Sequence, residues 1–452
     1  MEPFRYHVYA CEQKKPDGLP CCAARGALKT IDALRRELGK QGLVDTVQVT
    51  ACGSLGLCER GPNLVVYPDG IWYSGVTAAD VPELVREHFQ QGRPLERLVN
   101  RDENALRQEV TGNRNAYLGM MKAKDAAGVV PDELQAMIRG FMESRIVLTG
   151  IELDVFTAVQ DGATAAAVAA ARATEPRATA VLLDALAALE LLVKQDGSYR
   201  PAPVAARFLV AGAPDDATTA LKHNLSLWDR WSTLTACVRA GTSVSYQEMT
   251  ERDASWTVPF IAAMHRNAAL RAPLVVRAVG PGGALRLLDV GGGSGAYAIA
   301  FAQASPSLRA EIFDLPTVTP IARGHIAAAG LADRVTTRDG DLRQDDLGGG
   351  HDLVLISAIC HMLDPAQNQD LLRRVHAALQ PGGRVVIQDH VLDADRTSPR
   401  AGALFAVNML VGTQAGGTYS EDEYTAWLTG AGFTDVRRVK LPGPSDLMIA
   451  RR

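Results

Sequence analysis

The chain has 452 residues, of which 47% are hydrophobic and 22% charged, and its formal net charge is −4. This length exceeds one hydrophobic core, so two or three domains are expected. The charge balance provides no basic surface for nucleic acid, and no apolar run reaches the roughly 18 residues of a membrane span. The first residues, MEPFRYHVYACEQKK, lack the charged start and apolar run of a secretory signal, so a cytoplasmic protein is expected.

Residues 1–98 are predicted to form a small α/β module with the element order β-α-β-β-β-α. The segments RYHVYA and DTVQVTA favour strands, and residues 23–42 carry apolar side chains at helical spacing. The segment NLVVYPDGIWYSG is typical of a hairpin with its turn at Pro68-Asp69-Gly70, and a last helix follows near residues 78–90.

Residues 99–135 are polar and indicate a linker that is helical in part, and residues 136–250 indicate a mostly helical domain. Within that domain ATAAAVAAARA and RATAVLLDALAALELL favour helices, and VKQDGSYRPAP favours a hairpin, so the pattern resembles a winged helix. A winged helix also suits a DNA regulator, but the acidic balance argues against one. We expect this domain to serve in dimerisation or as a lid over the substrate.

Residues 251–452 alternate short apolar runs with helices. The runs are LRLLDV, AEIFDL, DLVLIS and GRVVIQD. This alternation predicts a doubly wound, Rossmann-like parallel sheet, and the whole chain is therefore placed in the α/β class.

A glycine-rich loop follows the first of these runs, in LRLLDVGGGSGAYAIAFA. Gly291 and Gly293 let the backbone approach a ligand closely, and Asp289 ends the strand before them. Together with Ala296 the loop also fits a dinucleotide fingerprint, so a nicotinamide-dependent oxidoreductase stays open.

Acidic residues end the next two strands. Asp314, in EIFDLP, is placed to accept the hydroxyls of a ribose. Asp341, in DGDL, is placed to meet an adenine edge, and Leu342 to pack on the ring.

The segments LLDVGGGSG, FDLP, RDGDL, ISAICHML and LQPGGRVVIQD together resemble the class I S-adenosylmethionine (SAM)-dependent methyltransferases. More narrowly, they resemble the O-methyltransferases of the caffeate and hydroxyindole type. The resemblance implies SAM as cofactor, a homodimer formed through residues 136–250, and O-methylation of a small aromatic or quinol-like acceptor. It also implies an antiparallel last strand, matched by GAGFTDVRRVKLPGPSDLMIARR, which a nicotinamide-binding fold would not need.

The resemblance assigns roles to further residues. His361, in Ile359-Cys360-His361, falls on the general base, and Asp389 falls on the acidic residue that flanks it. Leu315 and Ser357 fall beside the cofactor, Ser357 where the family has a lysine. The residues after the histidine, Met362 and Leu363, depart from the family, as does Thr418 at a second acidic position. These departures leave open a relative that binds SAM without methylating.

Five of the seven cysteines lie in the first 58 residues, as Cys11, Cys21, Cys22, Cys52 and Cys58. The segments CEQKKPDGLPCCAARG and CGSLGLCERGPNLVVYPDGIWYSGV resemble the thioredoxin-like [2Fe-2S] ferredoxins. The resemblance implies ligation by Cys11, Cys22 and Cys58, whereas the remaining family position falls on Ser54. Either Ser54 or Cys52 supplies the fourth ligand, and Cys52 is preferred because thiolate suits cluster iron. Two alternatives to a cluster-bearing methyltransferase remain open. One is an electron-transfer protein with a redox partner, and the other is a cluster-free scaffold with spare thiols.

Overall fold

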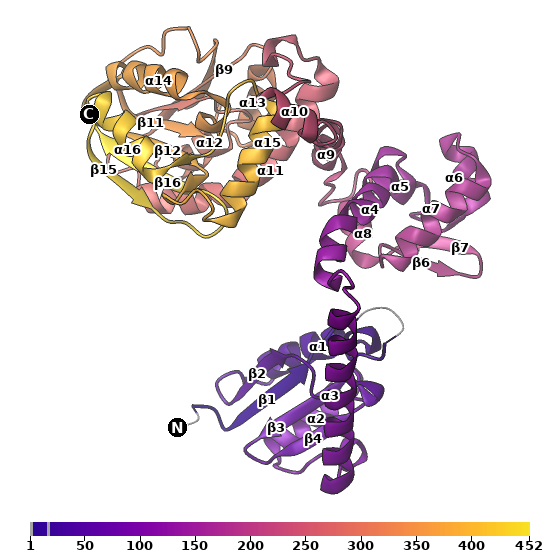
Figure 1. The fold of residues 1–452 in the computed structure, drawn as a ribbon. Coiled ribbons are helices and arrows are strands. Elements are labelled where there is room, and N and C mark those ends of the chain that lie inside the picture. The colour runs from indigo at the N-terminus through magenta and orange to yellow at the C-terminus, as the bar shows by residue number, and fades with distance from the viewer. Residues whose placement is uncertain (1–2, 16–18) are drawn as a thin grey trace. The chain divides into compact units, whose positions relative to one another are not determined.

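In the computed structural model, which describes residues 3–15 and 19–452, the chain divides by its contacts into two units, Met1–Gly140 and Phe141–Arg452 (Figure 1). The first unit contains a four-stranded mixed sheet in the order β2-β1-β3-β4, in which β1 is parallel to β2 and antiparallel to β3. Its elements are β1 (Tyr6–Cys11), α1 (Ala27–Lys40), β2 (Val47–Cys52), β3 (Asn63–Tyr67), β4 (Ile71–Ser74), α2 (Val81–Leu84) with a π-helical continuation (Val85–Gln90), and α3 (Glu103–Ala126). The predicted order of elements over residues 1–98 is confirmed.

Alternation along β1 sorts its side chains between two environments. Val8 and Ala10 are buried in a core with Ile31 and Leu34 of α1. Because successive strand residues point to opposite faces, Cys11 points away from that core, and it packs in a separate small cluster at the end of the strand.

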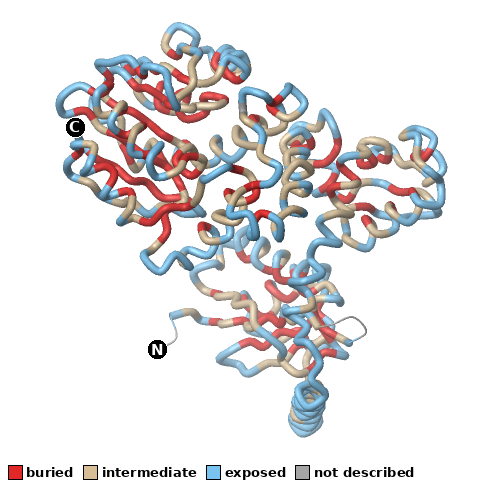
Figure 2. The backbone as a smooth tube through the Cα atoms, turned by 45° about the horizontal axis from the view of Figure 1, so that its top comes forward, coloured by how far each residue is buried: buried red, intermediate tan, exposed pale blue. Residues whose placement is uncertain are grey.

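The stretch predicted as a linker is largely helical. In α3 the Asp102 side chain caps the first turn by accepting from the Ala105 N–H at 2.9 Å. None of its residues is fully buried, as the pale colour of this helix shows (Figure 2). Asn113 Nδ2 donates to the Gly56 carbonyl at 2.7 Å, so α3 packs on the loop that carries Ser54 and Cys58.

The second unit begins with helices and a small three-stranded sheet in the order β5-β7-β6. Its elements are α4 (Asp132–Glu152, which begins before the boundary), α5 (Val155–Ala158), β5 (Ala163–Thr164), α6 (Ala165–Arg172), α7 (Pro176–Ala188), β6 (Leu192–Gln195), β7 (Ser198–Pro201), α8 (Pro203–Phe208), α9 (Thr218–Trp231), α10 (Leu234–Ala240) and α11 (Ala254–Val279). The predicted hairpin turns at Asp196 and Gly197, which both have positive φ, as a two-residue turn of this kind requires.

A seven-stranded sheet in the order β10-β9-β8-β11-β12-β16-β15 forms the rest of this unit. Its elements are β8 (Arg286–Val290), α12 (Ala296–Ala304), β9 (Arg309–Asp314), α13 (Thr319–Ala328), β10 (Val335–Asp339), β11 (His351–Ser357), α14 (Pro365–Ala378), β12 (Leu379–Asp389), α15 (Arg400–Gly412), α16 (Glu421–Gly430), β15 (Thr434–Val439) and β16 (Asp446–Arg451), with a short pair β13 (Val391–Leu392) and β14 (Tyr419–Ser420). The last strand, β16, is antiparallel to β12, as the sequence predicts.

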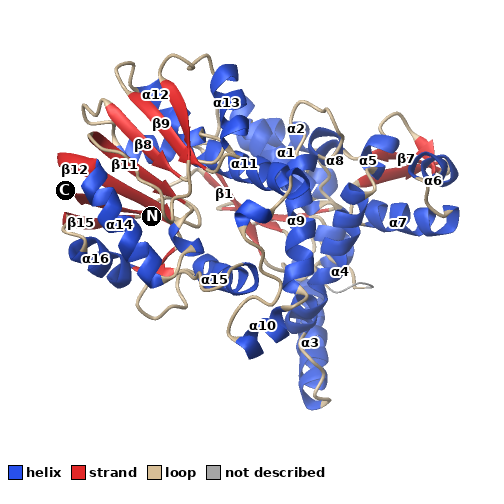
Figure 3. Cartoon of the chain, turned by 90° about the horizontal axis from the view of Figure 1, so that it is seen from above, coloured by secondary structure: helices blue, strands red, loops and turns tan. Residues whose placement is uncertain are grey.

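Helices cover both faces of this sheet (Figure 3). One buried core joins the strands to α14 and α16, and a second joins them to α11, α12 and α13. The order of the strands reverses between β8 and β11, and in open sheets of this type ligands bind at such a switch point, outside the carboxyl ends of the strands. Among the residues described, no helix combines the length and apolar character that crossing a membrane requires.

Candidate functional site

The glycine-rich loop leaves the carboxyl end of β8 at this switch point. Gly291 has φ +66°, and its N–H donates to the Phe313 carbonyl at 2.8 Å. A Cβ at Gly291 would overlap the side chain of Ile359 and lie 3.3 Å from Leu342 Cδ2. The loop therefore passes close to segments that follow β10 and β11, and only glycine fits there.

Asp314 ends the neighbouring strand β9 and holds the loop from the side. Its two carboxylate oxygens accept from the backbone N–H groups of Gly293 and Leu315, each at 2.7 Å. Burial raises the pKa of Asp314 to about 6, although these two hydrogen bonds favour its charged form.

Asp289 lies beneath the loop. It is fully buried, and a Cβ at Gly292 would lie 2.7 Å from its Cγ. Burial raises the pKa of Asp289 to about 7, and the nearby charge of Asp314 adds to the shift. The Asp289 side chain therefore packs directly against the glycine-rich loop at the end of β8.

The remaining predicted cofactor residues lie around the same edge of the sheet. Arg343 donates to the Asp341 carboxylate, with Nη2 at 2.9 Å. Burial alone would raise the pKa of Asp341, but the hydrogen bonds and charge of Arg343 outweigh it and lower the pKa. Ser357 Oγ donates to Gln388 Oε1 at 2.5 Å, so it belongs to a polar network at the ends of β11 and β12.

His361 and Asp389 form a buried pair beside this network. Asp389 ends β12 and is 1% exposed, and His361, just after β11, is 8% exposed. The imidazole Nδ1 lies 2.7 Å from Asp389 Oδ1, and the His361 backbone N–H donates to Oδ2 at 3.1 Å. Burial raises the pKa of Asp389, but the charge of His361 and its hydrogen bond outweigh burial and lower it. With Nδ1 held by a carboxylate, Nε2 is the nitrogen left to accept a proton.

Several residues of this region were not predicted as site residues. Phe405 presents its ring edge-on to His361, with centroids 4.8 Å apart, and stacks on His390 at 4.2 Å. Gln388 accepts from Tyr297 as well as Ser357 and donates to Ser445 Oγ. The only sequence signal for Gln388 is its place directly before Asp389.

Trp231 is a further residue that the sequence did not single out. Its Nε1 donates to Asn408 Oδ1 at 3.0 Å, so α9 and α15 are joined across 177 positions of sequence. Thr418 is buried and donates to the Gly402 carbonyl, and the Gly417 N–H donates to the His361 carbonyl at 2.9 Å. A threonine here therefore supports the loop behind the histidine.

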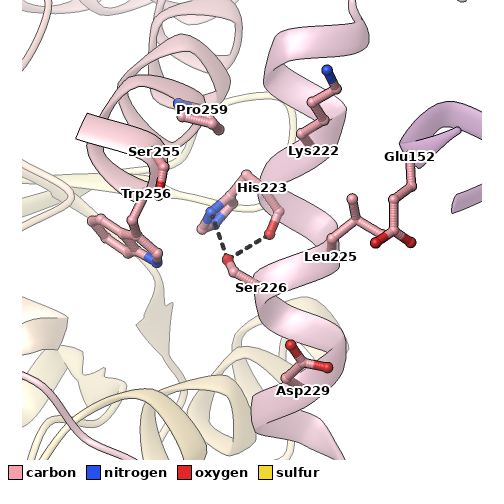
Figure 4. Close-up of a pocket in the computed structure, with 9 residues that line it drawn as sticks. All are labelled: Glu152, Lys222, His223, Leu225, Ser226, Asp229, Ser255, Trp256 and Pro259. Carbon is pink, nitrogen blue, oxygen red and sulfur yellow. Dashed lines mark hydrogen bonds between the residues drawn. The ribbon is translucent and has the colours of Figure 1, made fainter. Parts of the chain in front are cut away.

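A pocket of about 470 Å³ opens elsewhere in this unit, between α9, α11 and the end of α4 (Figure 4). It is lined by Glu152, Lys222, His223, Leu225, Ser226, Asp229, Ser255, Trp256 and Pro259. Burial and the charges of Arg230 and Arg252 lower the pKa of His223 to about 4. None of the lining residues is a predicted cofactor or catalytic residue, so we do not assign the candidate active site to this pocket.

In the first unit the two buried thiols of Cys11 and Cys22 lie together with Ala27. Cys22 lowers the pKa of Cys11 to about 6 by hydrogen-bonding its sulfur, and the backbone N–H groups of Gln13 and Leu55 act in the same direction against burial. The pKa of Cys22 is raised above its usual range by its bond to Cys11 and by burial.

The other predicted ligands come from the end of β2 and from the segment that follows it. Ser54 Oγ lies 3.4 Å from Cys58 Sγ, and Cys52 pairs in register with Cys11 across the parallel strands β2 and β1. Within residues 3–15 and 19–452, no three His, Cys, Asp or Glu side chains are arranged to hold a single metal ion. A two-iron cluster differs, because it is held by two pairs of donors, one on each iron. Cys11 and Cys22, buried in one small cluster, and Ser54 with the buried Cys58 provide two such pairs of donors, so the residues present fit that group.

Comparison with known proteins finds two families that match the later part of the chain. The O-methyltransferase domain family matches residues 231–434, and the O-methyltransferase dimerisation domain family matches residues 136–211. The first of these begins ahead of the boundary predicted at 251.

Individual relatives of the chain are also named as methyltransferases. The chain is 34% identical to 3-hydroxy-5-methyl-1-naphthoate 3-O-methyltransferase of Streptomyces sahachiroi, over 70% of this chain and 92% of that protein. It is 32% identical to the tetracenomycin polyketide synthesis 8-O-methyltransferase TcmO of Streptomyces glaucescens, over 71% and 97%. Human N-acetylserotonin methyltransferase, solved in complex with SAM, superimposes with a TM-score of 0.63 at 25% identity, over 72% and 99%.

The superimposed human enzyme shares the fold of the later part of the chain. At the switch point this chain has the glycine loop, and the pair of His361 and Asp389 lies at the same edge of the sheet. The chain belongs to the SAM-dependent O-methyltransferases that carry a helical dimerisation domain, with an additional mixed-sheet unit before it.

Proposed function

We propose that the protein transfers a methyl group from SAM to a hydroxyl of a small aromatic acceptor, a phenol or quinol. The observation that carries this proposal is the buried pair of His361 and Asp389 at the sheet edge where the glycine loop lies. One relative is named for 3-O-methylation of a hydroxynaphthoate and another for 8-O-methylation in tetracenomycin polyketide synthesis, and these names support the acceptor class.

The residues at the switch point fit SAM. Gly291 and Gly293 leave the backbone open to the ligand, and Asp314 offers a carboxylate to the two ribose hydroxyls. Leu315, Asp341, Leu342 and Ser357 complete the proposed surroundings. Bound SAM supplies an already activated methyl group, so the protein mainly has to position the acceptor and remove its proton.

His361 is proposed as the group that removes this proton. A phenol has a pKa near 10, and a neutral imidazole held within hydrogen-bond reach takes its proton as the oxygen becomes nucleophilic. The proton then resides on Nε2, and Asp389 stabilises the resulting imidazolium through Nδ1. The Phe405 ring packs against the His361 imidazole in a T-shaped arrangement and helps to orient it.

The direct test incubates the full-length protein with methyl-labelled SAM and a panel of phenols, naphthols and hydroquinones. The expected result is a labelled methyl ether identified by mass spectrometry. An amine, thiol or carbon product would instead overturn the O-methyl assignment. SAM binding measured by calorimetry without any labelled product across the panel and a native extract would favour a non-methylating role.

Affinity for SAM is expected to rise with pH between about 5 and 7. Burial raises the pKa of Asp314 to about 6, and its ionised form accepts the ribose hydroxyls. At pH 5 most of the carboxyl is protonated, so binding should be about tenfold weaker than above pH 7. Calorimetric titration across this range measures the effect. In Asp314→Asn the pH dependence should largely disappear, and a flat profile in the unchanged protein would contradict the role.

A homodimer is proposed through the matched dimerisation domain. In this domain α4 exposes Met137, Ile138, Phe141 and Met142, which share one helical face by their spacing. Sedimentation of the unchanged protein should give about twice the 48.3 kDa chain mass. The double change Ile138→Asp with Phe141→Asp should give the single mass, whereas Val44→Asp, an equally exposed apolar site in the first unit, should not. A monomeric unchanged protein would refute this interface.

For the first unit we propose a thioredoxin-like module that holds a [2Fe-2S] cluster. The donors that would hold it come from Cys11, Cys22 and Cys58, with the fourth from Ser54 or Cys52. Such a cluster supplies one-electron transfer, so a redox partner is implied. This second function is favoured by the grouping of the buried Cys11 and Cys22 thiols in one cluster and by the 3.4 Å distance between Ser54 Oγ and Cys58 Sγ.

A further inference from the structure

We propose that Ser54, and not Cys52, is the fourth ligand of the cluster, so that the site consists of Cys11, Cys22, Ser54 and Cys58. This inference rests on the proposed cluster in the first unit and deepens it. It is carried by how the structure groups the donors.

Each iron of a two-iron cluster takes two protein donors, so four ligands must divide into two pairs. Cys11 and Cys22 already form one pair, since both are buried in the same small cluster of side chains. Ser54 Oγ, 3.4 Å from Cys58 Sγ, forms the other.

Leu55 brings these two pairs together. Its side chain packs against the small buried cluster that contains Cys11 and Cys22. Because Leu55 directly follows Ser54, the second pair is held beside the first by a contact of the same loop.

The backbone approaches the second sulfur of the first pair. Asn63 Nδ2 donates to Cys22 Sγ at 3.3 Å, and a Cβ at Gly61 would lie 2.7 Å from that sulfur. Hydrogen bonds to ligand sulfurs are among the features that tune iron–sulfur sites.

Cys52 is grouped differently. It ends β2 directly opposite Cys11, and its carbonyl accepts from the Glu12 N–H at 3.0 Å, which holds it in the sheet. Using Cys52 would place three sulfurs on the Cys11 side and leave Cys58 alone. Ser54 gives two and two without any movement of the strand.

The loop that carries Ser54 is itself held in place. Ser54 Oγ accepts from the Gly56 N–H at 3.1 Å, and α3 holds the same loop through Asn113. A Cβ at Gly56, which has φ +83°, would lie 2.9 Å from Val110 Cγ1, so α3 lies directly against the loop.

The test uses the full-length protein reconstituted anaerobically with ferric iron and sulfide, then desalted. The readouts are iron and sulfide content, the visible spectrum of the oxidised form, the electron paramagnetic resonance spectrum after dithionite reduction, and the reduction potential from a redox titration. The variants are Ser54→Ala, Ser54→Cys and Cys52→Ala, with Cys21→Ala as a neighbouring thiol control, and circular dichroism confirms that each is folded.

We expect about two irons per chain in the unchanged protein and in Cys52→Ala and Cys21→Ala, with identical spectra. Ser54→Ala should lose most of its iron or change its resonance spectrum. Ser54→Cys should keep the iron and shift the reduction potential upward, because thiolate is a softer donor than a serine oxygen.

Two other outcomes count against the inference, and they are distinguishable. Iron lost in Cys52→Ala but retained with an unchanged spectrum in Ser54→Ala would make Cys52 the ligand and leave the proposed cluster standing. A folded, unchanged protein that takes up no iron or sulfide would overturn both the cluster and the ligand assignment.

Discussion

Replacing His361 by Ala is expected to lower kcat/KM for a phenolic acceptor by about 10²–10⁴-fold, because the remaining Asp389 carboxylate is a far weaker base than an imidazole. Asp389→Asn should cost less, about ten- to a hundredfold, since the imidazole remains but loses a charge-assisted hydrogen bond. Initial rates with labelled SAM measure both. SAM affinity should change little in either variant, because neither residue belongs to the glycine loop.

A control separates loss of the base from loss of structure. The defect of His361→Ala should shrink with acceptors of lower pKa, such as nitrophenols, which ionise without help. His376→Ala removes a partly buried histidine of α14, whose ring contacts Phe433, and this variant should keep nearly full activity. An equal defect of His361→Ala with acidic and ordinary phenols would argue against the general-base role.

The second large effect is expected at Gly291. A valine there would need positive φ, which is strained for a β-branched residue, and its Cβ would overlap Ile359. Strain of about 1–3 kcal/mol at the loop corresponds to up to about a hundredfold weaker SAM binding. Calorimetric titration of Gly291→Val against the unchanged protein measures this loss.

Gly324→Ala is the matched control for this change. Gly324 lies inside α13 with open space around its Cα, so a methyl group there should leave SAM binding unchanged and stabilise the helix by up to about 1 kcal/mol. If Gly291→Val bound SAM as tightly as Gly324→Ala does, the loop could not be the cofactor site.

Local patterns predicted much of this fold. The alternation of apolar runs and helices after residue 251 forms the seven-stranded sheet, and the Asp196-Gly197 turn joins β6 and β7 in the separate three-stranded sheet. The helix α3 in the polar stretch before residue 135 was harder to predict from the sequence. A helix without any fully buried residue has no apolar stripe that would mark it.

Some residues of the candidate sites could likewise be predicted from the sequence, and others could not. Glycines and acids at strand ends are visible in the sequence because their neighbours along the chain define the loop, as at Gly291 and Asp314. The motif resemblance pointed to His361 and Asp389, but their hydrogen bonds depend on β11 lying beside β12 in register. Phe405 and Gln388 carry no comparable local signal.

By itself, then, the sequence determined the class of the sheet, the glycine loop and the identity of the acid and histidine candidates. Only the tertiary structure decided which distant side chains meet: Trp231 with Asn408, Phe405 with His361, and Leu55 with Cys11. The physical reason is that periodicity and turn chemistry act over a few residues. A contact between loops depends instead on strand register and on the path of each loop.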